Sequence, residues 1–235
     1  VRVVYTVVNN DNTKEHILRT LSGGLSFFRR ARCLVGGAII DDVDYYNRVH
    51  EMLHVLTSKN NRDNDSIEGF EQRWDDDTNY ESWRTELNGI GGGAPNNAKT
   101  VSFKPLFGIL NQPKYVPLSW CPIMMEFEVV NNLTDPIASF NNGQVSHFTS
   151  DNTSTSWQIQ DVRIVCDVVT FDSSLQNSYA EMVLSGKSLP INYSTYISQF
   201  QTITSSDFAI NVSRSVTRLK TVFVSFDGVL ILIQV

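Results

Sequence analysis

The sequence has few cysteines, little charge and no long apolar run. Its 235 residues include only 3 cysteines, and charged residues make up 19%. Cys33, Cys121 and Cys166 form no Cys-x-x-Cys pair, which argues against a zinc ribbon, and an odd, sparse set excludes a disulfide framework. Their apolar neighbours predict buried free thiols in a reducing compartment. The longest apolar stretch, residues 229–233, has the length of a strand, so no transmembrane helix is expected.

The composition predicts a folded chain that does not coat nucleic acid. Apolar residues make up 41% and aromatic residues 11%, which is enough for a core and excludes disorder. The net charge of -6 disfavours a general nucleic-acid coat, which is usually basic. No signal peptide is evident, and both ends have the pattern of strands, so we expect the sequence to be part of a longer chain.

Most of the sequence carries the period-2 and short apolar patterns of β-strands. Gly36-Gly37 predicts a tight turn between two of these strands, and Asp227-Gly228 predicts another near the end. About ten short strands separated by long loops predict an antiparallel β-sandwich of the jelly-roll type. The clearest expected strands are residues 1–8, 27–35, 38–40, 100–103, 123–130, 157–171, 208–212, 219–226 and 229–235.

Two segments have helical patterns instead. The first is capped by Asp41 or Asp42 and runs to about Leu56, and the second covers residues 173–184, after a cap at Asp172 or Ser173, and stops at Gly186. Between them, residues 57–98 form a long polar excursion. The apolar side of the first helix is predicted to consist of Tyr45, Val49, Met52 and Leu56.

The first helix contains the strongest enzyme-like motif in the sequence. His50, Glu51 and His54 match H-E-x-x-H, which in zinc metalloproteases places two imidazoles on the metal and uses the glutamate to polarise water. A third ligand would have to be a downstream acid such as Glu81 or Glu86, in a region without a helical pattern. We therefore interpret the helix as structural and keep a zinc metalloprotease as the alternative function.

Two groups of charged residues on strands are weaker candidates for a functional site. Glu126 and Glu128 have the spacing of carboxylates in jelly-roll glycosidases, but alternation alone predicts a solvated strand face, so a glycosidase or carbohydrate-binding sandwich is the weaker rival. Arg29, Arg30 and Arg32 form the one dense basic cluster, which we interpret as a solvated or ion-paired face rather than a phosphate site.

Other motifs point to no particular chemistry. The sequence has no phosphate-binding glycine loop and no G-x-S-x-G nucleophile elbow. Five N-x-S/T sequons are interpreted as chance matches in asparagine-rich loops, since no secretory signal is evident; they begin at Asn64, Asn132, Asn152, Asn192 and Asn211.

The order of these features resembles one family of proteins. Residues 28–48 run strand, Gly-Gly turn, strand, aspartate and helix, and resemble the same passage of double jelly-roll (hexon-like) major capsid proteins. The likeness is closest to those of Polinton-type and adintovirus-like DNA viruses and more distant to those of the large nucleocytoplasmic DNA viruses. Further similar stretches follow in the family's order at residues 107–110, 116–118, 125–129, 156–172, 179–191 and 211–224.

The resemblance implies a structural viral protein rather than an enzyme. It implies a first jelly roll over residues 1–172, with the insertion 57–98, then a connector helix and the opening strands of a second roll over residues 173–235, because a full double roll needs about twice this length. The partners it implies are the chain itself, as pseudo-hexameric homotrimers in an icosahedral shell, and penton or minor capsid proteins, with no specific nucleic acid.

The same resemblance fixes the expected sites and location. The protein is expected in the capsid of a virion assembled inside the host cell, with no catalytic, cofactor-binding or metal-binding residue. Aromatic side chains on loops are typical of interfaces, so the expected subunit contacts are Trp74, Tyr80 and Trp83 in the polar excursion.

Overall fold

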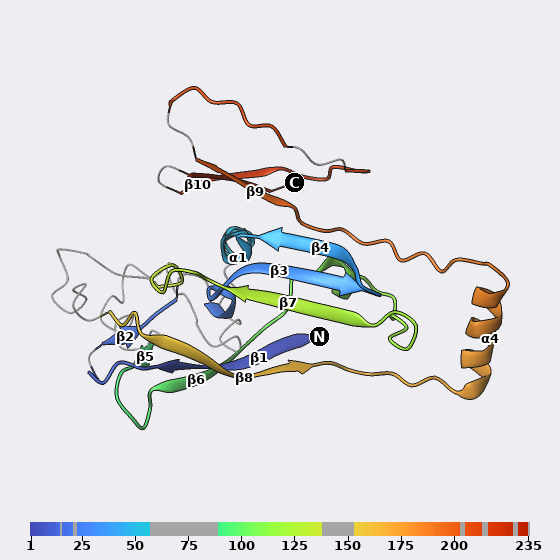
Figure 1. The fold of residues 1–235 in the computed structure, drawn as a ribbon, viewed down its shortest axis with the longest axis horizontal. Helices are drawn as coiled ribbons and strands as arrows, with labels where there is room; N and C mark the ends of the chain where they lie inside the picture. The colour runs from blue at the N-terminus through green and yellow to red at the C-terminus, as the bar shows by residue number, and fades with distance from the viewer. Residues whose placement is uncertain are drawn as a thin grey trace.

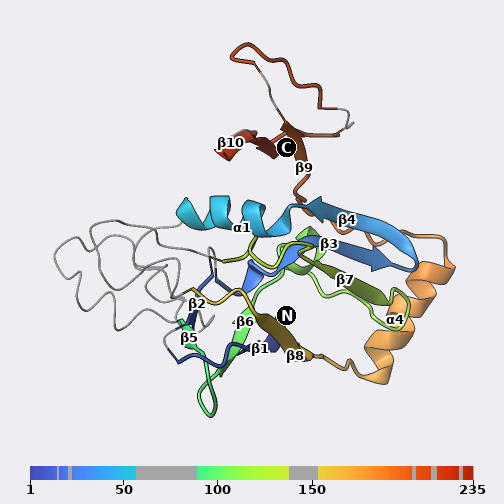
Figure 2. The ribbon, with the colours of Figure 1, turned by 60° about the vertical axis from the view of Figure 1, so that its left-hand side comes forward.

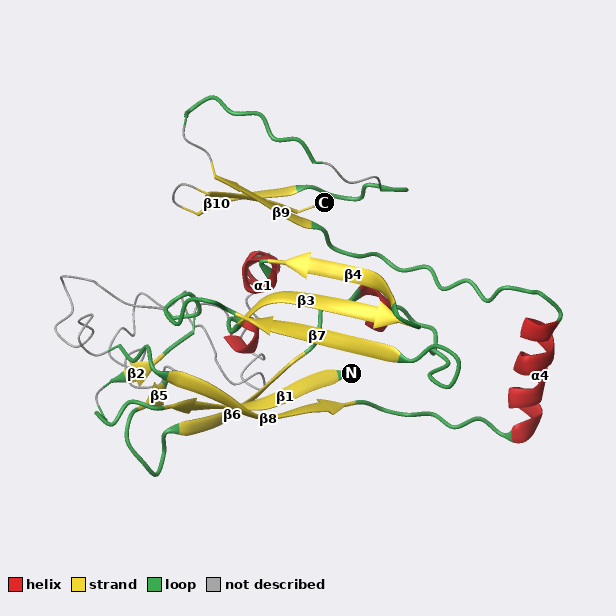
Figure 3. Cartoon of the chain, in the orientation of Figure 1, coloured by secondary structure: helices red, strands yellow, loops and turns green. Residues whose placement is uncertain are grey.

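The chain folds mainly into β-strands, with two α-helices among the residues that the computed structural model describes (Figure 1). All pairings between these strands are antiparallel, as the sequence predicts. Figure 3 shows two sheets close together and a third set apart. The described residues are 1–14, 16–20, 23–56, 89–137, 153–202, 205–212, 216–227 and 230–234.

The first sheet is built around the N-terminal strand β1 (Arg2–Asn9). It lies between β6 (Ala98–Phe103) and β8 (Trp157–Val165) in the order β6-β1-β8. Val3, Tyr5 and Val7 are buried while the residues between them are half-buried, because side chains alternate across a strand and only one face meets the core.

The second sheet has the order β4-β3-β7 and contains the predicted Gly-Gly hairpin. Strands β3 (Phe28–Val35) and β4 (Ala38–Asp44) are joined by Gly36 and Gly37, and β7 (Ile123–Val129) pairs with the other side of β3. Gly36 and Gly37 have φ angles of 57° and 84°, in the left-handed region that favours glycine. The turn places Val35 opposite Ala38, and the pairing shifts register further along, between Cys33 and Leu34.

Aromatic side chains join the inner faces of these two sheets. The Tyr5 ring of β1 lies 5.5 Å from Phe28 of β3, and Phe103 of β6 lies 5.7 Å from Phe127 of β7. Phe107 continues the cluster 5.8 Å from Phe127. Such pairs add to the free energy of area burial when the rings are tilted or edge-on, as these are. The core thus lies between the two sheets.

The two predicted helices are present, and one has the predicted limits. Helix α4 (Ser173–Leu184) begins after Asp172, whose carboxylate accepts from the Leu175 backbone N–H at 2.8 Å, and Gly186 follows with a φ of 78°. Both the aspartate cap and the glycine stop were expected from the sequence. It lies at the far end of the molecule, beyond β8 (Figure 1).

Helix α1 (Tyr46–Val55) starts later than predicted. Asp41 and Asp42 do not cap it, because β4 continues to Asp44. The predicted apolar side is also wrong in part: Tyr46 and Val49 are the buried residues, and Leu56 is 61% exposed. Figure 2 shows α1 beside the arrowhead of β4 and below the third sheet.

The rest of the described chain forms short elements and the third sheet. Strands β9 (Ser198–Thr202), β11 (Leu230–Gln234) and β10 (Phe223–Asp227) form this sheet in the order β10-β11-β9. The short elements are β2 (Ile17–Leu18), which pairs with β5 (Ile90–Gly91), and the 3-10 turns η1 (Gly23–Leu25) and η3 (Gly108–Leu110).

The strand expected over residues 219–226 begins only at Phe223, and two other strand predictions are wrong by more. Strand β8 ends at Val165 rather than near residue 171, and residues 208–212 form no strand. Both stretches have residues with high β propensity, but a strand also needs a neighbour to accept its backbone hydrogen bonds. The coarser prediction, a mainly β chain with antiparallel sheets and two helices, is confirmed.

Replacing Tyr5 with phenylalanine should destabilise the core although the ring is kept. The Tyr5 hydroxyl donates to the carbonyl oxygen of Gly24, and both residues are buried. Losing this donor should lower the free energy of unfolding by about 1–3 kcal/mol, measured by urea denaturation. Tyr115→Phe is the matched control, because Tyr115 is 69% exposed and its change should be close to neutral. Equal effects of the two substitutions would contradict this account.

Candidate functional site

The H-E-x-x-H motif lies on a helix, as predicted, but its glutamate is paired with an arginine. Glu51 Oε2 lies 3.5 Å from an Arg48 guanidinium nitrogen, and the other terminal nitrogen of Arg48 lies 3.3 Å from Asp135. A glutamate that polarises a metal-bound water must face the metal rather than a guanidinium. In this structure Glu51 is therefore ion-paired within its own helix.

The candidates for a third zinc ligand, Glu81 and Glu86, lie outside the described residues, as does the side chain of His54. Within the described ranges, no group of three or more histidine, cysteine, aspartate or glutamate side chains is placed to hold a metal ion. The described part of the chain thus gives the zinc hypothesis no ligand set.

The basic cluster lies on the outer face of the second sheet and is ion-paired. Arg30 of β3 makes two hydrogen bonds to Asp42 of β4, at 2.8 and 2.7 Å, and Arg32 lies 2.8 Å from Glu126 of β7. The hydrogen bonds to Asp42 raise the pKa of Arg30 above its ordinary value. The ion-paired interpretation is confirmed, so these arginines are not an open phosphate site.

Glu128, the second member of the proposed carboxylate pair, also belongs to this face. Its Oε1 lies 3.9 Å from Arg29, which lies 3.6 Å from Asp44 on the opposite strand. Arginines on the middle strand therefore alternate with acids on both neighbours, an arrangement that favours this strand order and leaves little net charge. Glu126 and Glu128 face arginines, not a saccharide-binding row of aromatic side chains.

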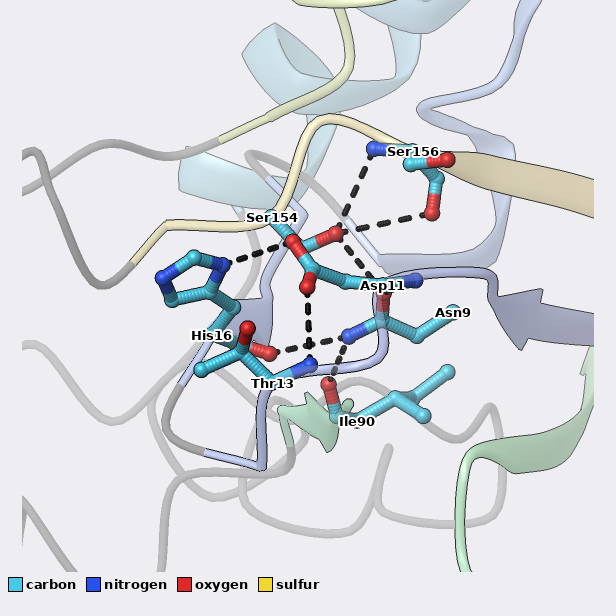
Figure 4. A network of polar contacts seen from close by, with 7 residues as sticks. All are labelled: Asn9, Asp11, Thr13, His16, Ile90, Ser154 and Ser156. Atoms are coloured by element: carbon cyan, nitrogen blue, oxygen red, sulfur yellow. Dashed lines mark hydrogen bonds and ion pairs between the residues drawn. The ribbon is translucent and has the colours of Figure 1, made fainter. Parts of the chain in front are cut away.

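A second polar network links the loop after β1 to β5 and to the segment just before β8 (Figure 4). His16 Nδ1 lies 2.7 Å from Asp11 Oδ2, and hydrogen bonds from the Thr13 backbone and from His16 lower the pKa of Asp11. Ser154 contacts Asn9 Oδ1 at 2.7 Å, while Asn9 Nδ2 donates to the Ile90 carbonyl at 2.8 Å. The serine hydroxyl is thus bound to Asn9 rather than to an activating imidazole, and the network holds loops together.

The most unusual polar group in the fold is Asp41, which the sequence pattern assigned to a helix cap. It lies on β4 and is 2% exposed. Its Oδ2 accepts from the Gly108 backbone N–H at 2.9 Å, and its Oδ1 accepts from the Thr195 hydroxyl. A carboxylate thus connects two distant parts of the chain inside the protein, and we call these three residues the Asp41 latch.

Thr195 belongs to residues 187–197, an extended segment that we call the arm. The arm runs from α4 to β9 alongside β4, at the edge of the second sheet (Figure 1). The arm backbone passes directly over Gly108, where a Cβ atom would overlap the Ser194 carbonyl oxygen. Any larger residue at position 108 would displace the arm from the latch.

Further contacts hold the arm and β9 beside β4. The Ser198 hydroxyl donates to the Asp44 carbonyl oxygen, and the rings of Tyr45 and Phe200 stack 4.3 Å apart. At the other end of the arm, Lys114 Nζ donates to the Pro190 carbonyl at 2.9 Å. The third sheet is therefore attached to the paired sheets by a row of side-chain contacts.

Burial determines the electrostatics of the latch. Desolvation raises the pKa of Asp41 to about 6, and the N–H groups of Gly108 and Ile109 oppose that shift. Burial also raises the pKa of the Cys33 thiol to about 11. Asp41 therefore changes its charge close to physiological pH, which an aspartate in water does not.

In contrast, the region around α4 is largely uncovered. None of the α4 residues is buried, and Leu184 is 86% exposed. In the segment before it, Val162, Ile164 and Val168 are each more than half exposed. Monomeric soluble proteins seldom expose continuous apolar surfaces of this kind without a partner.

The predicted interface residues and the comparisons add no further site. Trp74, Tyr80 and Trp83 lie outside the described residues. Comparisons with models of known protein families, with curated proteins and with solved structures find no match to this chain. Among the helices that the structure describes, none has the length and apolarity needed to cross a membrane.

The zinc alternative can be tested directly. Because no third ligand is placed among the described residues, we expect the protein, dialysed after exposure to zinc, to retain no stoichiometric metal by elemental analysis. His50→Ala should leave that metal content unchanged. About one zinc per chain that is lost in His50→Ala would instead support the metalloprotease.

Proposed function

We propose that this chain is part of a double jelly-roll major capsid protein that self-assembles as pseudo-hexameric homotrimers into an icosahedral shell. Its role is structural: rigid β units carry the contacts between copies, and no catalytic residue, metal or cofactor takes part. On this proposal the chain is found in virions and is assembled inside the host cell. Other copies of itself are its main partners, with penton or minor capsid proteins beside them.

The order of strand pairing supports the jelly-roll part of the proposal. In one sheet the first strand, β1, pairs with β8, and in the facing sheet β3 pairs with β7. The second pair is nested inside the first in the sequence, as happens when a long antiparallel hairpin is wrapped into two sheets. Jelly rolls have eight strands in two sheets and recur in viral capsid and lectin domains.

The position of the third sheet supports the division into two rolls. It follows α4 and the arm in the sequence, and it lies apart from the paired sheets, which it meets through Tyr45 and Phe200 (Figure 2). Val224 of β10 and Leu219 before it are 52% and 55% exposed. Three strands with exposed apolar side chains do not make a complete core, so this sheet fits the beginning of a second β unit.

One observation carries the assembly part of the proposal: apolar side chains on the core-facing side of β8 are uncovered. Ile164 lies opposite Val3, which is buried, yet Ile164 is 53% exposed. Val168, after β8, is 69% exposed, and no residue of α4 is buried. Covering such side chains on association would give the apolar centre that obligate subunit interfaces have. We assign this surface to contact with a second copy of the chain.

Substituting lysine for Ile164 and Val168 together should weaken self-association. Sedimentation velocity over a range of concentrations should show the wild-type chain passing from monomer to trimer. The double variant should associate at least about tenfold more weakly, because a buried interface would have to desolvate two ammonium groups. The fold should be kept, since both positions are exposed.

Gln158→Lys is the matched control, because Gln158 is an exposed residue of the same strand outside the apolar surface. It should associate like the wild-type chain. A wild-type chain that stays monomeric at all concentrations, or a double variant that still forms trimers at the wild-type concentration, would overturn the proposal.

A further inference from the structure

The contacts of the Asp41 latch connect three separate segments at one buried carboxylate, with Gly108 buried beside it and Thr195 on the exposed side. Asp41 comes from β4, Gly108 from the η3 turn and Thr195 from the arm. The closest approach is between the arm backbone at Ser194 and Gly108. Because the arm covers this point, release of the arm would expose the Asp41 carboxylate to water.

We propose that the Asp41 latch is a proton-dependent lock that holds the arm and the third sheet on the paired sheets more tightly in acid than at neutral pH. This inference goes beyond the capsid proposal. It concerns one chain alone and remains testable if the protein has another function.

The direction follows from the two states of the carboxyl group. In the docked state burial holds the pKa of Asp41 at about 6, and after release it should fall towards the ordinary value of 3.8. The docked state therefore binds the proton more tightly, so raising the pH through 6 weakens docking. From these two values, docking should be about tenfold weaker at pH 7.5 than at pH 5.

Other groups near the latch do not produce the same dependence. Cys33, Tyr46 and Tyr193 face Asp41 from β3, α1 and the arm, and burial raises the pKa of each, so all three stay uncharged below neutral pH. The charged neighbours are Asp44, which is paired with Arg29, and Lys220, which donates to the Ser194 hydroxyl. Asp41 is therefore the group that we expect to titrate.

Backbone hydrogen exchange measures this docking in the intact chain. Exchange should be followed by mass spectrometry at pH 5 and pH 7.5, with correction for the intrinsic pH dependence of amide exchange. In the wild-type chain, protection of Gly108 and Ile109, whose N–H groups lie against Asp41, should be about tenfold lower at pH 7.5, because release of the arm exposes these amides. Protection of β1 should not change, which separates release of the arm from general unfolding.

Asp41→Asn keeps the shape of the side chain and removes its titration. Its amide oxygen can accept from Gly108 and its amide nitrogen can donate to the Thr195 hydroxyl, so the arm should stay docked at both pH values. The control is Asp167→Asn, which neutralises an exposed aspartate and should keep the wild-type pH dependence. Should Asp41→Asn fail to fold, Thr195→Val should lower protection of Gly108 and Ile109 at both pH values and leave their pH dependence in place.

Three results would overturn the proposal. The first is equal protection of Gly108 and Ile109 at both pH values in the wild-type chain. The second is a pH dependence that persists in Asp41→Asn, which would assign it to another group. The third is a parallel loss of protection in β1, which would show that the whole fold loosens rather than the latch.

Discussion

Burial of aromatic rings between two sheets is the interaction on which the rest of the structure depends. Tyr5, Phe28, Phe103 and Phe127 come from four strands of two sheets, and their neighbouring ring centroids are 5.4–6.1 Å apart. Because a strand turns alternate side chains to opposite faces, burying this set fixes what faces outwards. The arginines and acids of the second sheet are then on its outer face, where they pair across strands.

Local signals in the sequence were sufficient where the structure depends on near neighbours. The limits of α4 follow from Asp172 and Gly186, and the β3–β4 hairpin follows from Gly36-Gly37. They failed where distant partners decide. The acids at the end of β4 favour a helix cap by propensity. In the structure Asp42 is paired with Arg30 on the neighbouring strand, so the strand continues.

The candidate sites show the same division. The alternation of residues 123–130 was enough to predict that Glu126 and Glu128 lie on an outer face, but nothing in the sequence identified the arginines of β3 as their partners. The role of Asp41 was not predictable, because Gly108 is 67 residues away in the sequence and Thr195 is 154 residues away. The one available signal was an aspartate beside the apolar run 38–40, which was equally compatible with a cap.

Polar and apolar contacts contribute differently to this structure. A buried carboxylate contributes little net stability, since desolvation offsets most of its hydrogen bonding, but it accepts few arrangements of its partners. The latch therefore defines where the arm lies on the paired sheets. Uncovered apolar side chains such as Ile164 have the opposite character, because their burial is favourable against many partner surfaces. A subunit that must meet its copies in one geometry needs the first kind of contact to position its parts and the second to drive association.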